Sequence, residues 1–442
     1  MPWATGNPGM WLALGVSLAF ALSMLVVEWR RAPLWDEREY LDAARGIQLD
    51  GLLSRWFSSG RRTYLYPFFL SLVRRIGGYP RGTVAVAQWL AWVGSCVWIS
   101  RTLNRARPWA PRGLWFTTLC NPFVLIYTVE YLTDAFSTAL VFVSLACAAA
   151  VASADRRKYW DALLGLAVGS AIMTRPSNVV LVPMAVAACW PGRVWTQRAS
   201  AIARAALAAA IVVAPQMIVN WSQYHVVQPL VVARLGAQQI SWGRVALKYA
   251  SAVAPNRPSQ VWYRNPYVRT TLVMGRHHLK IEADAAATPA SFSLLGNAWA
   301  TVRTLPLKTV ALLDQDLVFP YNQTLRPTYR WPVAAIHFPI LGLGVLGFIA
   351  FLRENDYCRR FAALAGIFVV SFVALYNLTV VEARFGLPLV AVFYLFAPAG
   401  AVFAAESMRA GPAFRRVWIP AVWLIAVSAL FAGARALTSL MA

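Results

Sequence analysis

The chain has 442 residues, of which 59% are apolar and only 13% are charged, about half the charged share of an ordinary soluble domain. Its helices would be apolar on every side, which excludes a soluble multidomain protein. The net charge is +23, but the Arg residues lie mostly in short loops between apolar runs. This distribution is typical of membrane topology, so we expect no nucleic-acid partner.

Apolar runs of about 20 residues, the length that crosses a bilayer, fill most of the chain. They predict an all-α polytopic membrane protein with about eleven transmembrane helices, at 9–29, 83–103, 113–129, 133–152, 159–174, 177–190, 201–221, 332–352, 361–379, 386–405 and 418–437. The fifth and sixth runs are short, and the alternative is one long helix that continues through Arg175-Pro176.

The charges of the connecting loops decide between these two topologies. Arg and Lys residues crowd the second, fourth, sixth, eighth and tenth connections. All of these loops fall on one side only if 159–190 is a helical hairpin. The positive-inside rule makes that side cytoplasmic, with the N-terminus inside.

Two long loops then lie outside the cytoplasm, at about 30–82 and at 222–331. We therefore divide the chain into three parts. A catalytic-type transmembrane module at 1–221 includes the first loop. The extracytoplasmic loop at 222–331 follows, and the C-terminal transmembrane helices occupy 332–442.

Both outside loops are predicted to contain helices. Asp36, Tyr40 and Ala43 share one face of a helix that starts the first loop. Within 62–77, apolar and aromatic residues form one face beside several Arg residues, which is typical of a helix lying in the membrane interface. The stretch 298–318 is also predicted to be helical and partly amphipathic. Basic residues in an outside loop suit anionic lipid headgroups, so membrane lipids are expected partners.

This topology collects ionisable residues on the outside face. Ionisable side chains at membrane depth are costly, so they tend to face a cavity and to serve a function. Glu130 and Asp134 are four residues apart and are expected to share one helix face. The full set is Asp36, Glu37, Glu130, Asp134, Arg175, Glu382 and Arg384.

Each of these residues also has an ordinary structural explanation. Asp36 and Asp134 could be helix N-caps. Arg175 could extend to the lipid headgroups, and Arg384 could simply pair with Glu382. Capping and pairing explain the residues one by one, but the convergence of seven on one face favours a site.

Acids and arginines in an outside cavity suit one kind of chemistry. A carboxylate can take a proton from an acceptor hydroxyl or amine. The planar guanidinium group of Arg matches phosphate oxygens, and a cation stabilises phosphate as it leaves. The pattern therefore indicates transfer from a lipid-linked phosphate donor.

Five short stretches resemble the GT-C superfamily of integral-membrane glycosyltransferases. They are WDEREY (35–40), NPFVLIYTVEYLTDAFSTAL (121–140), MTRPSNVVLVP (173–183), APQMIVNW (214–221) and EARFGLP (382–388). The nearest branch looks like the group of protein O-mannosyltransferases, aminoarabinose transferases and RgtA-to-D-like proteins. The first four motifs lie in the first half of the chain, and their order and topology carry the resemblance.

The resemblance implies a GT-C fold and a polyprenyl-phosphate sugar donor, with transfer that inverts the anomeric carbon on the extracytoplasmic face. Asp36 matches the acid that serves as general base. Asp134 matches the second acid, which orients the acceptor or supports the first. Glu37 and Glu130 complete the candidate catalytic set, and no individual role is assigned to either.

The resemblance also suggests residues for the donor phosphate. Arg61 or Arg62 could fill the place of a basic residue in the first loop that often meets phosphate. Arg384 and Arg175 are further candidates. One position departs from the aminoarabinose-transferase pattern, because Glu39 stands where that branch has a basic residue. This departure weakens a lipid A assignment.

A metal ion is an open alternative. Some GT-C members hold a divalent ion between the two acidic motifs, and others need none. Hard carboxylate ligands such as Asp36 and Asp134 would suit Mg²⁺ or Mn²⁺. No metal ligand is assigned.

Two rival functions stay open. A transporter or flippase of lipid-linked sugars should have ionisable residues near the membrane midplane and an inverted repeat. A non-catalytic membrane component of a glycan-assembly complex would need no paired acids. The composition is compatible with a bacterial inner membrane, but the sequence names neither the sugar nor the acceptor.

Overall fold

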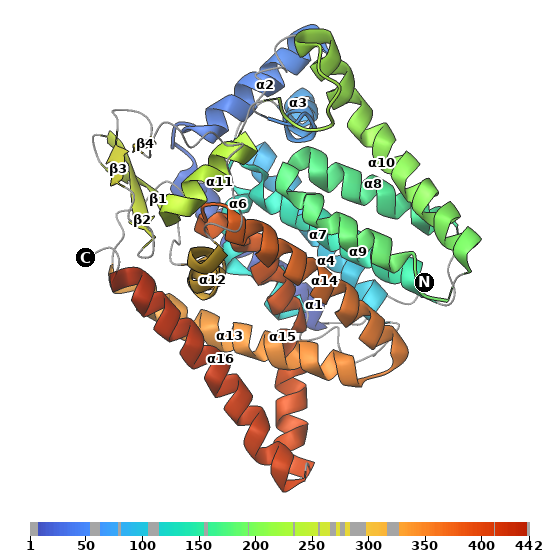
Figure 1. Cartoon of the computed structure of the whole chain (residues 1–442), viewed down its shortest axis with the longest axis vertical. Coiled ribbons are helices and arrows are strands. Elements are labelled where there is room, and N and C mark those ends of the chain that lie inside the picture. The colour runs from blue at the N-terminus through green and yellow to red at the C-terminus, as the bar shows by residue number, and fades with distance from the viewer. Residues whose placement is uncertain are drawn as a thin grey trace.

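The computed structural model describes residues 8–53, 62–77, 81–104, 115–153, 158–192, 194–232, 235–254, 257–265, 271–274, 279–282, 298–315, 327–410 and 412–439. Helices dominate them (Figure 1). In chain order the elements are α1 (Pro8–Glu28), α2 (Asp36–Asp50), α3 (Leu65–Gly77), α4 (Arg81–Asn104), η2 (Trp115–Leu119), α6 (Pro122–Thr128), α7 (Thr133–Ala152), α8 (Tyr159–Thr174), η3 (Pro176–Val180), α9 (Leu181–Ala188), α10 (Trp195–Tyr224), α11 (Leu235–Val245), β1 (Ala246–Ala254), β2 (Arg257–Arg264), β3 (Thr271–Met274), β4 (Leu279–Glu282), α12 (Ala298–Leu313), α13 (Pro327–Arg353), α14 (Asp356–Leu378), η5 (Ala383–Gly386), α15 (Leu387–Ala410) and α16 (Ala413–Ser439).

Among the described residues, eight helices are long and apolar enough to span a membrane, and Tyr159–Thr174 and Pro176–Ala188 are shorter apolar segments. The predicted span at 113–129 is broken instead into the π-helix η2 and the short helix α6. Asn121 separates them, because its side chain accepts hydrogen bonds from two backbone N–H groups of α6. The predicted number of about eleven transmembrane helices is therefore not confirmed.

The chain between α8 and α9 does not continue as one helix. Arg175 has extended backbone angles, with φ −147° and ψ 115°, and this breaks the hydrogen-bond ladder between its neighbours. The helix η3 follows it directly, starting with Pro176, which fits the first turn of a helix. The alternative of a single long helix through Arg175-Pro176 is therefore wrong.

Helix α7 lies at the centre of the bundle, where α4, α8, α9, α14 and α15 pack around it (Figure 1). Its membrane-length window is 83% buried, more than in any other described span. The C-terminal helices cross closely through small residues, as membrane helices often do. A Cβ atom on Gly347 would lie 1.9 Å from the carbonyl oxygen of Phe396, so α13 and α15 touch backbone to backbone.

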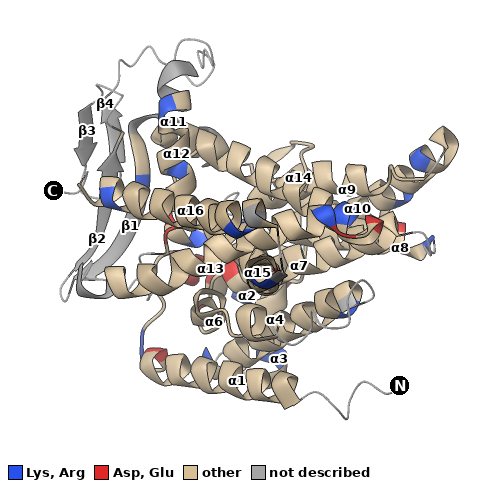
Figure 2. Ribbon diagram, turned by 90° about the horizontal axis from the view of Figure 1, so that it is seen from below, with Lys and Arg blue, Asp and Glu red and all other residues tan. Residues whose placement is uncertain are grey.

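The ends of α4 and α7 and the start of α14 meet at one end of this bundle. Tyr357, at the start of α14, donates a hydrogen bond to the carbonyl oxygen of Thr102 at 3.0 Å, and Arg360 donates to that of Ala152 at 3.0 Å. The ends of α4 and α7 therefore lie beside the loop that follows Arg353. Figure 2 shows that the long helices are mostly uncharged and that charged residues gather toward helix ends.

The loop after α10 contains structure that the sequence did not predict. Two antiparallel hairpins, β1–β2 and β3–β4, follow α11. The all-α prediction holds for the bundle and misses these strands. The predicted helices at 62–77 and 298–318 are present as α3 and α12. These connections bring α11, β1 and α12 to the same end of the bundle as α2 (Figure 1).

Candidate active site

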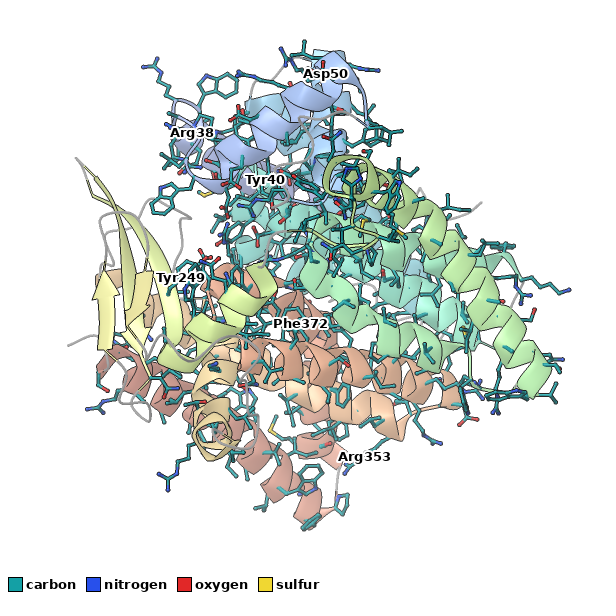
Figure 3. All side chains as sticks on the ribbon, turned by 45° about the horizontal axis from the view of Figure 1, so that its top comes forward. Arg38, Tyr40, Asp50, Tyr249, Arg353 and Phe372 are labelled. Carbon is teal, nitrogen blue, oxygen red and sulfur yellow. The ribbon has the colours of Figure 1, made fainter. Side chains whose placement is uncertain are left out.

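A cavity of about 530 Å³ lies where α2, α7, α11, α14 and η5 meet. Its wall includes most of the charged residues that the sequence singles out, together with several aromatic side chains. Figure 3 labels two of these aromatic residues, Tyr40 on α2 and Tyr249 on β1. The charged lining residues are Asp36, Glu39, Arg62, Asp134, Arg175 and Arg384.

Asp36 is the first residue of α2, and it makes no capping hydrogen bond. The preceding residue, Trp35, has a positive φ of 44°, a region that costs a residue other than glycine roughly 1–3 kcal/mol. The Asp36 carboxylate instead faces two arginines. Its Oδ1 accepts a hydrogen bond from Arg62 Nη2 at 2.5 Å, and its Oδ2 accepts one from Arg384 Nη2 at 2.9 Å.

Asp134 lies in the first turn of α7 and faces the same cavity. The N-cap position belongs to Leu132, and no side chain caps this helix. Asp134 Oδ1 accepts a hydrogen bond from Arg175 Nη1 at 2.6 Å, and Asp134 Oδ2 lies 4.0 Å from Arg384 Nη1. The capping role considered for this residue is therefore replaced by contact with two cations.

Arg384 connects the two acidic motifs. Its Nε donates to Glu382 Oε2 at 2.7 Å, as the pairing explanation required. Its remaining nitrogens reach Asp36 and Asp134, which pairing with Glu382 alone does not explain. Arg175 does not extend away from the protein, because its guanidinium group lies 4.6 Å from the ring centre of Phe385.

Arg62 is the third cavity arginine. Its Nε donates to Glu39 Oε2 at 2.9 Å, and its guanidinium group lies 4.9 Å from the ring centre of Tyr40. Arg61, the alternative candidate, lies outside the described residues. Arg38 is exposed and lies at the periphery (Figure 3), so the basic residue inside the first acidic motif does not line the cavity.

The cavity therefore brings three acidic and three basic side chains close together. Burial would raise the pKa of Asp36, but the neighbouring Arg62 and Arg384 outweigh burial and hold that pKa well below its usual range. Burial would lower the pKa of Arg62, and the surrounding acidic groups raise it above its usual value. Each arginine stays charged. Arg62 and Arg384 are each shared between carboxylates, and Arg175 pairs with Asp134. A competing anion could replace these carboxylates.

A second charged cluster lies beside the cavity and does not line it. Glu37 and Glu130 are fully buried, and both contact Arg31 and Arg81. Arg81 Nη1 donates to Glu37 Oε1 at 3.2 Å and to Glu130 Oε2 at 3.0 Å. Glu28 also pairs with Arg31 in this cluster. The catalytic role considered for Glu37 and Glu130 gains no support from this position.

The expectation that Glu130 and Asp134 share a helix face is wrong. Glu130 lies in the turn between α6 and α7, before the helix begins at Thr133. The ladder of i and i+4 neighbours therefore does not reach it. The two acids separate, one into the buried cluster and the other into the cavity.

Sequence reasoning missed several residues of this region. Arg31 and Arg81 lie next to predicted spans, and their signal was the excess of basic residues in the first loop. Gln239, Trp242 and Tyr249 line the cavity from α11 and β1. They carry no motif, and only the tertiary fold brings them to the site.

Arginines hold both cavity aspartates. Both Asp36 oxygens and one Asp134 oxygen accept hydrogen bonds from arginine nitrogens. Within the described part of the chain, His, Cys, Asp and Glu form no group of three suited to a metal. The acids of this site are therefore paired with arginine.

Comparison with known proteins gives a result for the fold. No protein-family model matches the chain, and no curated protein matches it by sequence. The chain is similar in structure to ArnT from Cupriavidus metallidurans, a GT-C glycosyltransferase, in the apo state, with a TM-score of 0.54 and 12% identity over 97% of this chain and 71% of that one. The same protein bound to undecaprenyl phosphate gives a TM-score of 0.52 and 13% identity, covering 97% and 72% of the two chains.

A further similarity is to the oligosaccharyltransferase AglB from Archaeoglobus fulgidus, with a TM-score of 0.47 and 12% identity over 96% of this chain and 55% of that one. This likeness is too distant to carry an argument. The two ArnT structures establish that the chain has the GT-C fold, as the motifs predicted. With its apolar helices, the chain is an integral membrane protein.

Proposed function

We propose that the protein is an inverting glycosyltransferase that moves a sugar from a polyprenyl-phosphate donor to an extracytoplasmic acceptor, which is a glycan, a lipid or a protein. The observation that carries the proposal is a single cavity in which Arg62, Arg175 and Arg384 alternate with carboxylates. A fold alone hosts many activities, so the argument rests on these residues.

We assign the three cavity arginines to the donor phosphate. Guanidinium groups bind phosphate oxygens in pairs, and preorganised cations stabilise the negative charge that grows on a leaving phosphate. ArnT from C. metallidurans has been crystallised with undecaprenyl phosphate, and the shared fold supports a donor of that class. A polyprenyl phosphate is therefore the product that would leave the site.

Asp36 is the proposed general base, and its contacts suggest when it acts. Both of its oxygens accept hydrogen bonds from Arg62 and Arg384, which makes it a weak base. A donor phosphate competes for the same guanidinium groups. When these arginines turn toward phosphate, Asp36 loses the contacts that lower its pKa. Donor binding would thus prepare the base for the acceptor.

The transfer step then follows as one displacement. Asp36 accepts the proton of an acceptor hydroxyl or amine while the acceptor atom forms a bond to the anomeric carbon. The bond between that carbon and the phosphate oxygen breaks, and its electron pair leaves with the phosphate. Attack from the face opposite the phosphate inverts the anomeric carbon. Asp134 supports the step by holding Arg175 and by orienting the acceptor.

The proposed location is a bacterial inner membrane, with the active site on the extracytoplasmic side. The basic loops near Arg353 and Arg360 lie at the end of the bundle opposite the cavity. The positive-inside rule assigns that basic end to the cytoplasm. A transporter would need charges near the midplane, whereas the cavity acids lie at helix ends.

The test replaces Asp36 by Asn, which keeps the size of the side chain and removes the base. Mass spectrometry of glycans and lipid-linked sugars in a deletion strain first identifies the donor and the acceptor. Purified protein in liposomes is then supplied with both. We expect transfer to fall by about 10²- to 10⁴-fold, the usual contribution of a general base. Undecaprenyl phosphate should still bind.

Asp42→Asn is the matched control. Asp42 is on the same helix, and its side chain is 73% exposed. This variant should transfer at the wild-type rate. Wild-type transfer by Asp36→Asn would contradict the assignment of the base, and movement of intact donor across the liposome membrane would favour a flippase.

A further inference from the structure

The segment from Asn377 to Gly386 carries Arg384 into the cavity, and after Leu378 it is not part of a long helix. It leaves α14 at Leu378, runs through extended residues and forms the single turn η5. Such a segment could move unless other elements hold it. Three neighbouring elements, α11, β1 and α12, make contacts along its length and lie beside one another (Figure 1).

Backbone hydrogen bonds attach the segment to α11 and β1. The N–H of Val380 donates to the carbonyl of Gln239 at 3.2 Å, and the N–H of Tyr249 donates to the carbonyl of Val381 at 2.7 Å. The N–H of Val381 donates to the carbonyl of Leu247 at 3.3 Å. The segment is thus paired like a short strand, immediately before Arg384.

The Lys308 side chain secures this junction from α12. Its buried amine donates hydrogen bonds to the carbonyls of Gly243 at 2.8 Å, Asn377 at 2.9 Å and Thr379 at 3.0 Å. These bonds use all three N–H groups of an ammonium. They join the end of α11 to both sides of the point where α14 ends. A buried cation is costly, and carbonyl oxygens alone compensate it here.

The end of α12 and the residues that follow it hold the segment on both sides of Arg384. Gln315 Nε2 donates to the carbonyl of Ala383 at 2.9 Å. A Cβ atom on Gly386 would lie 1.7 Å from the carbonyl oxygen of Leu312, so the two backbones are in contact. Lys308 and Leu312 are four residues apart on one face of α12, and Gln315 follows two residues after the helix ends at Leu313.

We propose that Lys308 is a positioning residue, which fixes the 377–386 segment so that the guanidinium group of Arg384 meets the donor phosphate. This inference rests on the proposed function, because it assumes that Arg384 binds phosphate. Lys308 itself donates to backbone carbonyls of α11 and of the 377–386 segment and does not line the cavity. Its effect on the donor must therefore pass through Arg384.

A purely structural role makes a different prediction from a positioning role. If Lys308 only stabilises the fold, its loss lowers stability and leaves the donor affinity of the folded protein unchanged. If it positions Arg384, its loss weakens donor binding, and that loss disappears once Arg384 is already absent. Residues that act through a shared group are non-additive in a double-mutant cycle.

The experiment measures binding of undecaprenyl phosphate to purified full-length protein in detergent micelles. Lys308→Met should raise the dissociation constant on the order of 10- to 100-fold, since small displacements of a binding group have effects of this size. In an Arg384→Gln background, Lys308→Met should change it by less than about two-fold. Arg303 is an exposed basic residue of the same helix, so the Arg303→Met variant should bind undecaprenyl phosphate as the wild type does.

Gln315→Leu is the second variant, because it removes one hydrogen bond to the same segment and no buried charge. It should weaken binding in the same direction and by a smaller factor. Wild-type binding by a folded Lys308→Met protein would overturn the inference. An equal loss in the presence and absence of Arg384 would overturn it too, because the effect would not pass through that residue.

Hydrogen exchange separates a failure of this inference from a failure of the proposed function. Lys308→Met should speed amide exchange at Val380 and Val381, and Arg303→Met should not. If the wild-type protein binds no undecaprenyl phosphate, the proposed donor is wrong. The exchange rates of Val380 and Val381 would then still decide whether Lys308 fixes the segment. Unchanged rates in Lys308→Met would overturn the inference that it does.

Discussion

Two charged clusters begin at adjacent residues and differ in what surrounds them. Asp36 belongs to the cavity and its side chain is 28% exposed, whereas the Glu37 side chain is fully buried. Consecutive helical residues point about 100° apart, so the first turn of α2 sends one acid to the cavity and the next into the protein. Both acids contact arginines, and only the cavity acid can be reached by a substrate.

The difference indicates that one cluster supports the other. Glu37 Oε1 accepts a hydrogen bond from the N–H of Tyr131 at 3.1 Å, and Glu37 Oε2 accepts one from the N–H of Leu34 at 3.0 Å. These contacts tie the turn before Asp134 to the turn before Asp36. The buried cluster thus fixes the spacing of the two cavity acids without meeting the substrate.

The largest predicted effect comes from breaking the buried cluster. Arg81→Met leaves Glu37 and Glu130 with one less cation in a buried place, and breaking a buried pair typically costs about 3–5 kcal/mol. We expect a lower yield of folded protein and a lower unfolding temperature in detergent. Any folded fraction should bind undecaprenyl phosphate normally. Arg81 does not line the cavity, and the Glu37 hydrogen bonds to Leu34 and Tyr131, which set the spacing of the cavity acids, do not involve it.

Arg45→Met is the control for this prediction. Arg45 is 62% exposed and lies 4.0 Å from the exposed Asp42, so its replacement should leave stability unchanged. A stable Arg81→Met protein that fails to bind the donor would contradict the conclusion that the buried cluster supports the fold and not the binding of substrate. The buried cluster would then belong to the active site.

A smaller effect is expected in the cavity, on the affinity for the donor rather than on stability. Arg62→Gln removes a charged group that we assign to phosphate, and hydrogen bonds to charged groups contribute about 1.5–3 kcal/mol. The dissociation constant of undecaprenyl phosphate should therefore rise on the order of 10- to 100-fold. Stability should change little, because the Asp36 and Glu39 side chains left behind are partly exposed.

Arg45→Gln provides the same substitution at an exposed position of α2, and it should bind the donor as the wild type does. Both affinities are measured by titration in detergent micelles at one salt concentration. Unchanged affinity in Arg62→Gln would remove this arginine from the phosphate site. A large loss of stability would show that the cavity cluster also supports the fold.

The sequence predicted the bundle and much of the cavity because both depend on local patterns. Apolar length identifies spans, and loop charge orients them. Successive loops alternate between the two sides of the membrane, which predicted one shared side for Asp36, Asp134, Arg175 and Arg384. Helical spacing failed for Glu130 because Asn121 and the turn after α6 delay the start of the next helix. A break of this kind depends on tertiary packing that apolar length does not encode.

The contribution of the second outside loop could not be predicted for a different reason. Tyr249 and Gln239 reach the cavity because β1 and α11 pair with Val380 and Val381, more than 100 residues away along the chain. Backbone pairing at such a distance leaves no periodic signal in the sequence. Lys308 likewise binds carbonyl oxygens, which every residue carries, so nothing in the composition marks it.

The smallest predicted effect is a pH dependence of stability that arises from the buried cluster alone. Burial raises the pKa of Glu130, and the Glu37 carboxylate raises it further against the opposing Arg31 and Arg81. Three carboxylates, including Glu28, share two guanidinium groups here, so one excess negative charge favours uptake of a proton.

The folded protein therefore holds this proton more tightly than the unfolded chain. Its contribution to stability is fully present below the ordinary pKa of 4.5 and is lost as the pH rises through the raised pKa. The free energy of unfolding should fall by up to about 1.4 kcal/mol per pH unit in that window. Asp36 adds nothing there, because its lowered pKa shifts its own contribution to more acidic solutions.

Unfolding profiles of Glu130→Gln and wild-type protein between pH 5 and pH 8 test this difference. The Gln variant cannot take up the proton, so its stability should vary less with pH than that of the wild type. Asp42→Asn, which changes an exposed acid, should keep the wild-type slope. Equal slopes in Glu130→Gln and the wild type would mean that Glu130 stays ionised when folded, with Arg31 and Arg81 compensating both glutamates.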